Sequence, residues 1–211
     1  IKKYHVLHKQ YLSTGKGLSE FANDLRATGL LPINLDDYTS EIYSKKQVVY
    51  AEGKRPRYLY YLKSGKVKAY KTHEDGKEYI TDLYSNGDFL GYPALIEDRN
   101  YDDTAVALEE SEIIQIPKED FQQFIYGDIV VATKFIRIIT QNVKDKEERL
   151  LNLAYSSLRK RVAKALVDIN AKFNTDGQNR PIEISREDIA QYVGTATESL
   201  IRTLSDFKSE K

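Results

Sequence analysis

The chain has 211 residues with 32 basic and 32 acidic side chains, so its formal net charge is zero and no chain-wide field attracts a polyanion. This length suits one large domain or two modest domains, each able to bury a real core. The absence of cysteine excludes disulfides, thiolate metal sites and cysteine-bound iron–sulfur clusters, and the absence of a membrane-length apolar stretch or a signal peptide predicts a cytoplasmic protein.

The first predicted element is a helical segment or linker over residues 1–35. Leu18, Phe21 and Leu25 recur at helical spacing, and Pro32 is a stop signal near the end of the segment. We therefore expect short helices before the first strand.

Residues 36–126 are predicted to form a β-roll. Short β-rich runs alternate with evenly spaced glycines, and Asp75-Gly76 between two of the runs is a strong hairpin signal. Such a series is typical of a closed or rolled antiparallel sheet, similar to a jelly roll, in which the many tyrosines pack in the core or across strands. The predicted strands are Val48–Tyr50, Tyr58–Lys63, Val67–Thr72, Glu78–Tyr84, Thr104–Leu108 and Glu112–Ile116.

A long helix is predicted over residues 127–154. Its apolar residues alternate between spacings of three and four, which is the seam of a two-helix coiled coil. This pattern predicts a homodimer, and the alternative is an amphipathic helix packed within its own chain. The predicted dimer residues are Ile129, Ile136, Ile139, Val143, Leu150 and Leu153.

Two further features surround this seam. A second stripe of Val131, Phe135 and Ile138 is predicted to pack on the β-roll, so that the helix is covered on two sides. Lys146 falls on the seam, where it either weakens the dimer or extends to the edge of the interface. A short helix from Pro117 to Ile125 is expected to precede the long one.

Residues 155–211 are predicted to hold a helix-turn-helix. An amphipathic helix over residues 156–170 comes first, and a polar turn over residues 174–181 separates it from the motif itself. Ser185 is expected to cap the next helix, and Gly194 supplies the turn that ends it.

The last predicted helix starts at Thr195 or Thr197. Its apolar positions Leu200, Leu204 and Phe207 are predicted to face inward. The polar positions are then left outward, as a helix that enters the major groove of DNA requires. An ordinary helical hairpin is the alternative interpretation of this local pattern.

Val193, Gly194, Glu198 and Arg202 form a Val-Gly-x-x-x-Glu-x-x-x-Arg motif that resembles the DNA-binding domain of the Crp–Fnr superfamily of bacterial transcription regulators. The resemblance covers about residues 42–211, because the runs 58–68, 75–78, 87–91 and 116–121 are similar to the effector β-roll of that family.

This resemblance implies an α+β fold with an effector β-roll, a long dimerisation helix and a winged helix-turn-helix domain. It further implies a homodimer that binds a palindromic operator in double-stranded DNA, and it allows RNA polymerase as a partner. The β-hairpin wing of the family is expected after Lys211, and a start at Ile1 suits a chain cut downstream of a receiver domain, as in some members.

The family reads base edges with the glutamate and arginine that correspond to Glu198 and Arg202 here. Glutamate can accept from cytosine N4, and arginine can make a bidentate contact with guanine O6 and N7. The alternative is that these two residues do not read DNA and form only a surface ion pair on one helix face. Thr197 and Ser199 are further base-reading candidates, and the candidate phosphate ligands are Ser185, Thr195, Arg159, Lys160 and Arg161.

The effector pocket departs from the family pattern. Members that bind cyclic nucleotides place a glutamate after a glycine to hold the ribose, and an Arg-Ser pair downstream to hold the phosphate. Here Tyr92 follows Gly91, and Asp102, Asp103 and Thr104 stand at the downstream position, where two carboxylates would repel a phosphate. We therefore expect a degenerate pocket, with control by another ligand or by an upstream signalling domain.

No catalytic, metal or cofactor site is predicted. The three histidines are His5, His8 and His73, and none has a nucleophile or ligand partner at diagnostic spacing; His73 alone lies in the roll, so haem is also poorly supported. An enzyme is therefore not expected. The rival hypothesis is a ligand-binding or protein-interaction sensor whose helix-turn-helix does not function.

Overall fold

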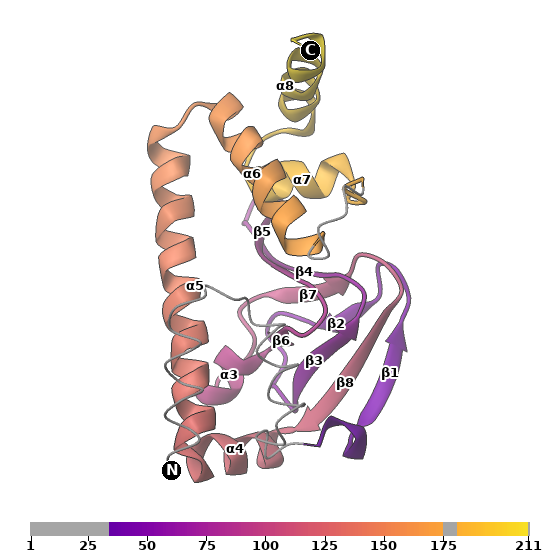
Figure 1. Cartoon of the computed structure of the whole chain (residues 1–211), viewed down its shortest axis with the longest axis vertical. Coiled ribbons are helices and arrows are strands. Elements are labelled where there is room, and N and C mark those ends of the chain that lie inside the picture. The colour runs from indigo at the N-terminus through magenta and orange to yellow at the C-terminus, as the bar shows by residue number, and fades with distance from the viewer. Residues whose placement is uncertain (1–33, 175–180, 211) are drawn as a thin grey trace.

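The computed structural model describes residues 34–174 and 181–210. The helical segment expected over residues 1–35, with His5 and His8, lies outside the described residues up to residue 33, and so does most of the polar turn expected over residues 174–181. The described chain forms a β-sheet domain, a long helix along one side, and three helices at the far end (Figure 1). This order confirms the predicted α+β architecture.

The β-sheet domain consists of two four-stranded sheets in which every recorded strand pair is antiparallel. The strand order is β1-β8-β3-β6 in one sheet and β2-β7-β4-β5 in the other. Because the first strand pairs with the last, the chain closes on itself as a roll. The strands are β1 Thr39–Tyr43, β2 Val48–Tyr50, β3 Tyr58–Ser64, β4 Val67–Thr72, β5 Glu78–Tyr84, β6 Phe89–Leu90, β7 Thr104–Ala107 and β8 Ser111–Pro117.

The six predicted strands coincide with β2, β3, β4, β5, β7 and β8, and Asp75-Gly76 turns the hairpin between β4 and β5. Two strands were not predicted. In β1 only Tyr43 is buried, and β6 has only two residues, so neither shows the alternation of buried and exposed residues that marks a strand in a sequence. Pairing with β8 and β3 makes them strands.

Strand β3 lies between two parts of the core. Leu59 and Tyr61 belong to the cluster that packs against the long helix, whereas Tyr60 and Leu62 belong to the cluster inside the roll. Successive side chains of a strand point to opposite faces, so both faces of β3 are buried. The roll is therefore anchored to the long helix through its own central strand.

The long helix is α5, Ile129–Tyr155, preceded by the short helix α4, Lys118–Gly127. Asp128 caps α5 by accepting a hydrogen bond from the backbone N–H of Val130 at 2.7 Å. The stripe of Val131, Phe135 and Ile138 is buried in the cluster that contains β3, which confirms the predicted packing on the roll.

The far end of the molecule is a group of three helices around one small core, α6 Leu158–Phe173, α7 Arg186–Val193 and α8 Thr197–Ser209. Ser185 caps α7 as predicted, and Gly194 ends that helix with φ of +72°. Of the two predicted starts of the last helix, Thr197 is correct; Ala196 is the N-cap and makes no side-chain cap hydrogen bond.

Candidate functional site

The outward face of α8 is polar. Leu200 is fully buried, and Leu204 and Phe207 pack against the same core, as predicted. Glu198 and Arg202 lie one helical turn apart on the opposite side and are exposed. Neither side chain forms an ion pair among the described residues, so the alternative of a Glu198–Arg202 surface pair is not seen in this structure.

The start of α8 supplies hydroxyl and amide groups beside these charges. Thr195, Thr197 and Ser199 are each half-buried. The N–H groups of the first turn of a helix have no intrahelical partner and carry partial positive charge, which favours contact with an anion such as a DNA phosphate. The polar surface of α8 therefore begins with donors and continues with the two exposed charges.

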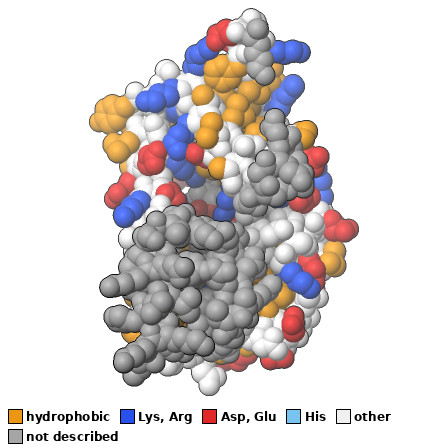
Figure 2. Space-filling model, viewed as in Figure 1, with side chains coloured by type: hydrophobic (Ala, Val, Ile, Leu, Met, Phe, Trp, Pro, Cys, Tyr) orange, Lys and Arg blue, Asp and Glu red, His pale blue; other side chains and the backbone are white. Residues whose placement is uncertain are grey.

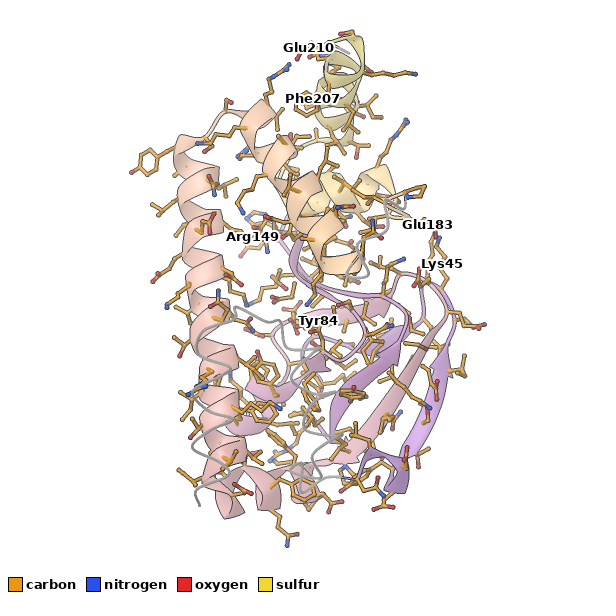
Figure 3. All side chains as sticks on the ribbon, in the orientation of Figure 1. Lys45, Tyr84, Arg149, Glu183, Phe207 and Glu210 are labelled. Atoms are coloured by element: carbon orange, nitrogen blue, oxygen red, sulfur yellow. The ribbon has the colours of Figure 1, made fainter. Side chains whose placement is uncertain are left out.

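The three basic residues at the start of α6 have different surroundings. Lys160 is exposed, whereas Arg159 pairs with Glu210 and lies 4.7 Å from the centre of the Phe207 ring (Figure 3 labels Phe207 and Glu210). Arg161 donates from Nη1 to the backbone oxygen of Leu153 at 3.3 Å, and its Nε is buried. The sequence analysis predicted the same phosphate-binding role for all three residues. Among the described residues, only Lys160 of the three is both exposed and without an ion pair.

Ser185 is occupied by its capping role. Its hydroxyl accepts from the backbone N–H of Asp188 at 3.0 Å and donates to the Asp188 carboxylate at 2.5 Å. A hydroxyl has one proton to donate, so Ser185 cannot make this bond and also donate to a phosphate. The predicted phosphate role of Ser185 therefore requires the bond to Asp188 to break.

Several tyrosines are buried together in the interior of the roll. The ring of Tyr101 stacks on that of Tyr50 with centroids 4.1 Å apart, and Tyr60 lies 5.8 Å from Tyr50. Gly91 has φ of +78°, and a Cβ built there would come within 3.3 Å of Tyr101. Gly91 thus allows Tyr101 to occupy the space beneath the short helix α3, Tyr92–Ile96.

Tyr92 is also part of the packing and not of an open pocket. Its side chain is buried, and its hydroxyl accepts a hydrogen bond from Nδ2 of Asn142 on α5 at 2.6 Å. The residue that stands in place of the family's ribose-binding glutamate therefore links the roll to the long helix.

The two carboxylates of the degenerate pocket have separate partners. Asp102 pairs with Lys71 at 2.8 Å and with Arg99 at 3.5 Å; burial acts to raise its pKa, but these cations lower it. Burial, together with the neighbouring carboxylates of Asp102 and Asp82, raises the pKa of Asp103 to about 6. The charges of Lys71 and Arg99 compensate that of Asp102. The tyrosines packed inside the roll are therefore a stronger obstacle to a nucleotide than the repulsion between Asp102 and a phosphate that the sequence predicted.

Thr104, the last residue predicted for the pocket, has a structural partner. Its hydroxyl oxygen accepts from the backbone N–H of Glu52 at 3.1 Å. The five predicted pocket residues are thus brought to one part of the roll, but all contribute to its own packing or hydrogen bonding.

The seam of α5 lies on the exposed side of the helix. Ile129, Ile136, Val143 and Leu150 are between 51% and 79% exposed, and Ile139 is 38% exposed. Such a row of large apolar side chains on one helix face is typical of a surface that a partner covers. The alternative that α5 packs only within its own chain leaves this row uncovered among the described residues.

Two seam positions also have neighbours in their own chain. Lys146 pairs with Asp82 of β5 at 3.2 Å, so its side chain points toward the roll of its own chain. It therefore neither lies within the apolar row nor extends to the edge of that row. Leu153 is 42% exposed, and a Cβ built at Gly194 would lie 3.5 Å from its Cδ1. The end of the seam therefore contacts the turn between α7 and α8 of the same chain.

Contacts that the sequence did not predict connect the roll to the three-helix group. Lys68 of β4 lies 2.7 Å from the carboxylate of Asp188 and 3.0 Å from the amide oxygen of Gln191, both on α7. Arg149 of α5 donates to the backbone oxygens of Ile80 and Thr81 at 2.8 Å and of Tyr192 at 3.1 Å. No sequence signal marks such pairs, because Lys68 and Asp188 are 120 residues apart.

Comparison with known proteins matches both parts of this structure. A model of the cyclic nucleotide-binding domain matches residues 40–128, and a model of the Crp-like helix-turn-helix domain matches residues 160–211. The chain belongs to the Crp–Fnr superfamily. This family consists of DNA-binding transcription regulators. The two matches confirm the resemblance noted in the sequence.

Two curated relatives and one solved structure illustrate the similarity. The fumarate and nitrate reduction regulatory protein of Vibrio cholerae is 28% identical over 170 residues, which cover 79% of this chain and 68% of that protein. The cyclic AMP receptor protein of Thermus thermophilus is 26% identical over 186 residues, covering 86% and 84%. The structure of FixK2 from Bradyrhizobium japonicum superposes with a TM-score of 0.72 at 22% identity, covering 82% and 85%.

The relatives are transcription regulators and not enzymes. Among the described residues, no group of histidine, cysteine and carboxylate side chains could hold a metal ion. No helix in that part of the chain is long and apolar enough to cross a membrane.

Proposed function

We propose that this Crp–Fnr regulator acts as a homodimer that places α8 of each subunit in successive major grooves of a palindromic operator, with half-sites about one helical turn apart. The observation that carries the proposal is the outward face of α8, where Glu198 and Arg202 are exposed without a protein ion pair. A cytoplasmic location, division into the segments 1–35, 36–126, 127–154 and 155–211, and the absence of enzymatic activity are parts of this proposal.

In this proposal Arg202 donates two hydrogen bonds to guanine, and Glu198 accepts one from cytosine N4. Thr197 and Ser199 lie at the start of the same helix and supplement these base contacts. Lys160 and Thr195 bind phosphate, and Arg159 joins them when Glu210 releases it. These phosphate contacts position the helix, whereas the base contacts give specificity.

Replacing Arg202 by alanine is expected to cost about 1–3 kcal/mol of binding free energy on the preferred site and to relax the preference for one G·C pair. Replacing Lys160 by alanine should instead weaken binding to all sequences similarly and reduce the slope of log affinity against log salt by roughly one. Selection of binding sites from random DNA, followed by titrations at several salt concentrations, measures both effects.

Either of two results would contradict the base-reading role of α8. If selection with the intact protein enriches no palindrome, or if the Arg202→Ala variant selects the same motif as the wild type, α8 does not read bases. The chain would then be a ligand-binding or protein-interaction sensor with a non-functional helix-turn-helix.

We further propose that the signal is not a cyclic nucleotide. Tyr101 and Tyr50 stack on each other in the interior of the roll, and Tyr92 is bonded to α5. Calorimetric titration with cyclic AMP and cyclic GMP is expected to give no heat of binding, with the cyclic AMP receptor protein of Thermus thermophilus as the positive control. Binding of either nucleotide with micromolar affinity would show that the tyrosines move aside and that the proposal is wrong.

A further inference from the structure

A cleft lies where the roll, the long helix and the three-helix group meet. Its volume is about 470 Å³, and its walls are β5, the second half of α5, α6 and the end of α7. This volume is within the range of small-molecule sites, roughly 300–1,000 Å³. Figure 3 shows Arg149 between α5 and the helices α6 and α7, and Figure 2 shows basic and acidic side chains interleaved beside the upper part of α5.

Three of the five cationic side chains that line the cleft are already paired with carboxylates. These pairs account for most of the acidic side chains of the lining. The remaining acid, Asp145, accepts a hydrogen bond from Gln141 at 2.8 Å. The ion pairs are Lys146 with Asp82 at 3.2 Å, Lys164 with Asp168 at 2.9 Å and Glu148 at 3.4 Å, and Lys172 with Asp88 at 2.6 Å.

The other two cations, Arg149 and Arg161, have no carboxylate partner among the described residues. Arg149 donates only to backbone oxygens, and its guanidinium lies 5.2 Å and 4.3 Å from the ring centres of Tyr79 and Tyr192. Arg161 donates to one backbone oxygen, and its buried Nε has no hydrogen-bond partner in the described structure. A buried donor without an acceptor is costly, so a ligand oxygen that reached this Nε would remove that cost.

We propose that the cleft binds a small ligand carrying an oxyanion, a phosphate or carboxylate group held by the guanidiniums of Arg149 and Arg161. Three of the five N–H groups of Arg149 already donate to backbone oxygens, so Arg149 offers the anion its two remaining donors and its charge, and Arg161 adds the N–H of its unpaired Nε. The tyrosine rings beside Arg149 offer an apolar wall to the rest of the ligand.

The lining of this cleft contains none of the five predicted pocket residues and none of the predicted base-reading residues of α8, although Asn142, which lines the cleft, bonds to Tyr92. Because its walls come from β5, α5, α6 and α7, a ligand held there contacts both the roll and the helices that carry α8. Binding stabilises whichever arrangement of these parts fits the ligand. The cleft would therefore transmit a chemical signal to the position of α8, and anion binding itself does not depend on DNA binding.

The test uses the full chain and three probes: inorganic phosphate, pyrophosphate and citrate, each titrated by calorimetry at constant ionic strength against sodium chloride. Phosphate and pyrophosphate represent phosphorylated ligands, and citrate represents carboxylates. At least one probe is expected to bind at concentrations up to roughly 10 mM and to shift the Nε–H resonance of Arg161 in a ¹H–¹⁵N spectrum. The probe that binds most tightly indicates the anionic group of the natural ligand.

Replacing Arg161 by glutamine should weaken that binding at least about tenfold, since it removes a charge-assisted bond. Arg186→Gln is the matched control, because Arg186 is exposed on α7 and does not line the cleft. If Arg161→Gln does not fold, the shift of the Arg161 resonance in the wild-type protein decides.

Three results would overturn the proposal. The first is that no probe binds, or that chloride produces the same response. The second is equal binding by the wild type and Arg161→Gln. The third is loss of DNA affinity in Arg161→Gln without any anion binding, which would make Arg161 the DNA phosphate ligand that the sequence predicts.

Discussion

Replacing Ile136 and Ile139 together by glutamate is expected to convert the proposed dimer into monomers. Their side chains are 61% and 38% exposed on one face of α5, in the middle of the apolar row. A two-fold interface brings the same face of each subunit together, so the double variant would place four carboxylates in contact without cations. Because each subunit of the proposed dimer would bind one half-site, affinity for a palindromic operator should fall by roughly 10²–10⁴-fold.

Light scattering at micromolar protein concentration measures the first effect, and titration with whole and half operators measures the second. The matched control is Val167→Glu, since Val167 is 67% exposed on α6 and lies outside the apolar row. This control should remain dimeric. A wild-type protein that is already monomeric at this concentration would contradict the proposed dimer.

Replacing Phe135 by alanine is expected to destabilise the protein by about 3–5 kcal/mol. Phe135 is 4% exposed, and its ring centre lies 5.1 Å from that of Phe121, 5.6 Å from that of Tyr92 and 5.8 Å from that of Phe89. Its removal leaves a cavity between α5 and the roll. Urea denaturation measures the loss of free energy of unfolding. Both proteins are compared at one protein concentration, because the stability of a dimer depends on concentration.

Lys144→Ala is the control for this experiment. Lys144 is exposed on the same helix, so its replacement should change the free energy of unfolding by no more than about 0.5 kcal/mol. A loss below about 1 kcal/mol for Phe135→Ala would mean that the site collapses or that α5 is not held on the roll through this ring.

Much of the fold could be predicted because its signals are local. Cap and turn residues marked α7 and its end, since Ser185 and Gly194 act on their own neighbours in the chain. The two stripes of α5 were visible because residues three and four apart share a helix face. β1 was missed because it is held by pairing with β8 and buries only one residue.

The candidate DNA surface was also predictable, whereas the roll interior was not. Glu198 and Arg202 follow a motif of fixed spacing on one helix, and α8 leaves both exposed. That Tyr101 stacks on Tyr50 beneath Gly91 depends on how distant strands approach each other. Composition had indicated only that the tyrosines of the roll serve its packing.

The sequence by itself determined the order of six of the eight strands and of the helices from α4 onward, the polar and apolar faces of those helices, and the family. These properties arise from side-chain spacing within one segment. Only the tertiary structure decided that Lys146 turns to Asp82, that Arg149 and Lys68 connect the roll to α7, and that Arg161 lies in a cleft apart from Lys160. Each of these outcomes depends on segments far apart in the chain, whose approach is set by packing of the whole core and leaves no local pattern.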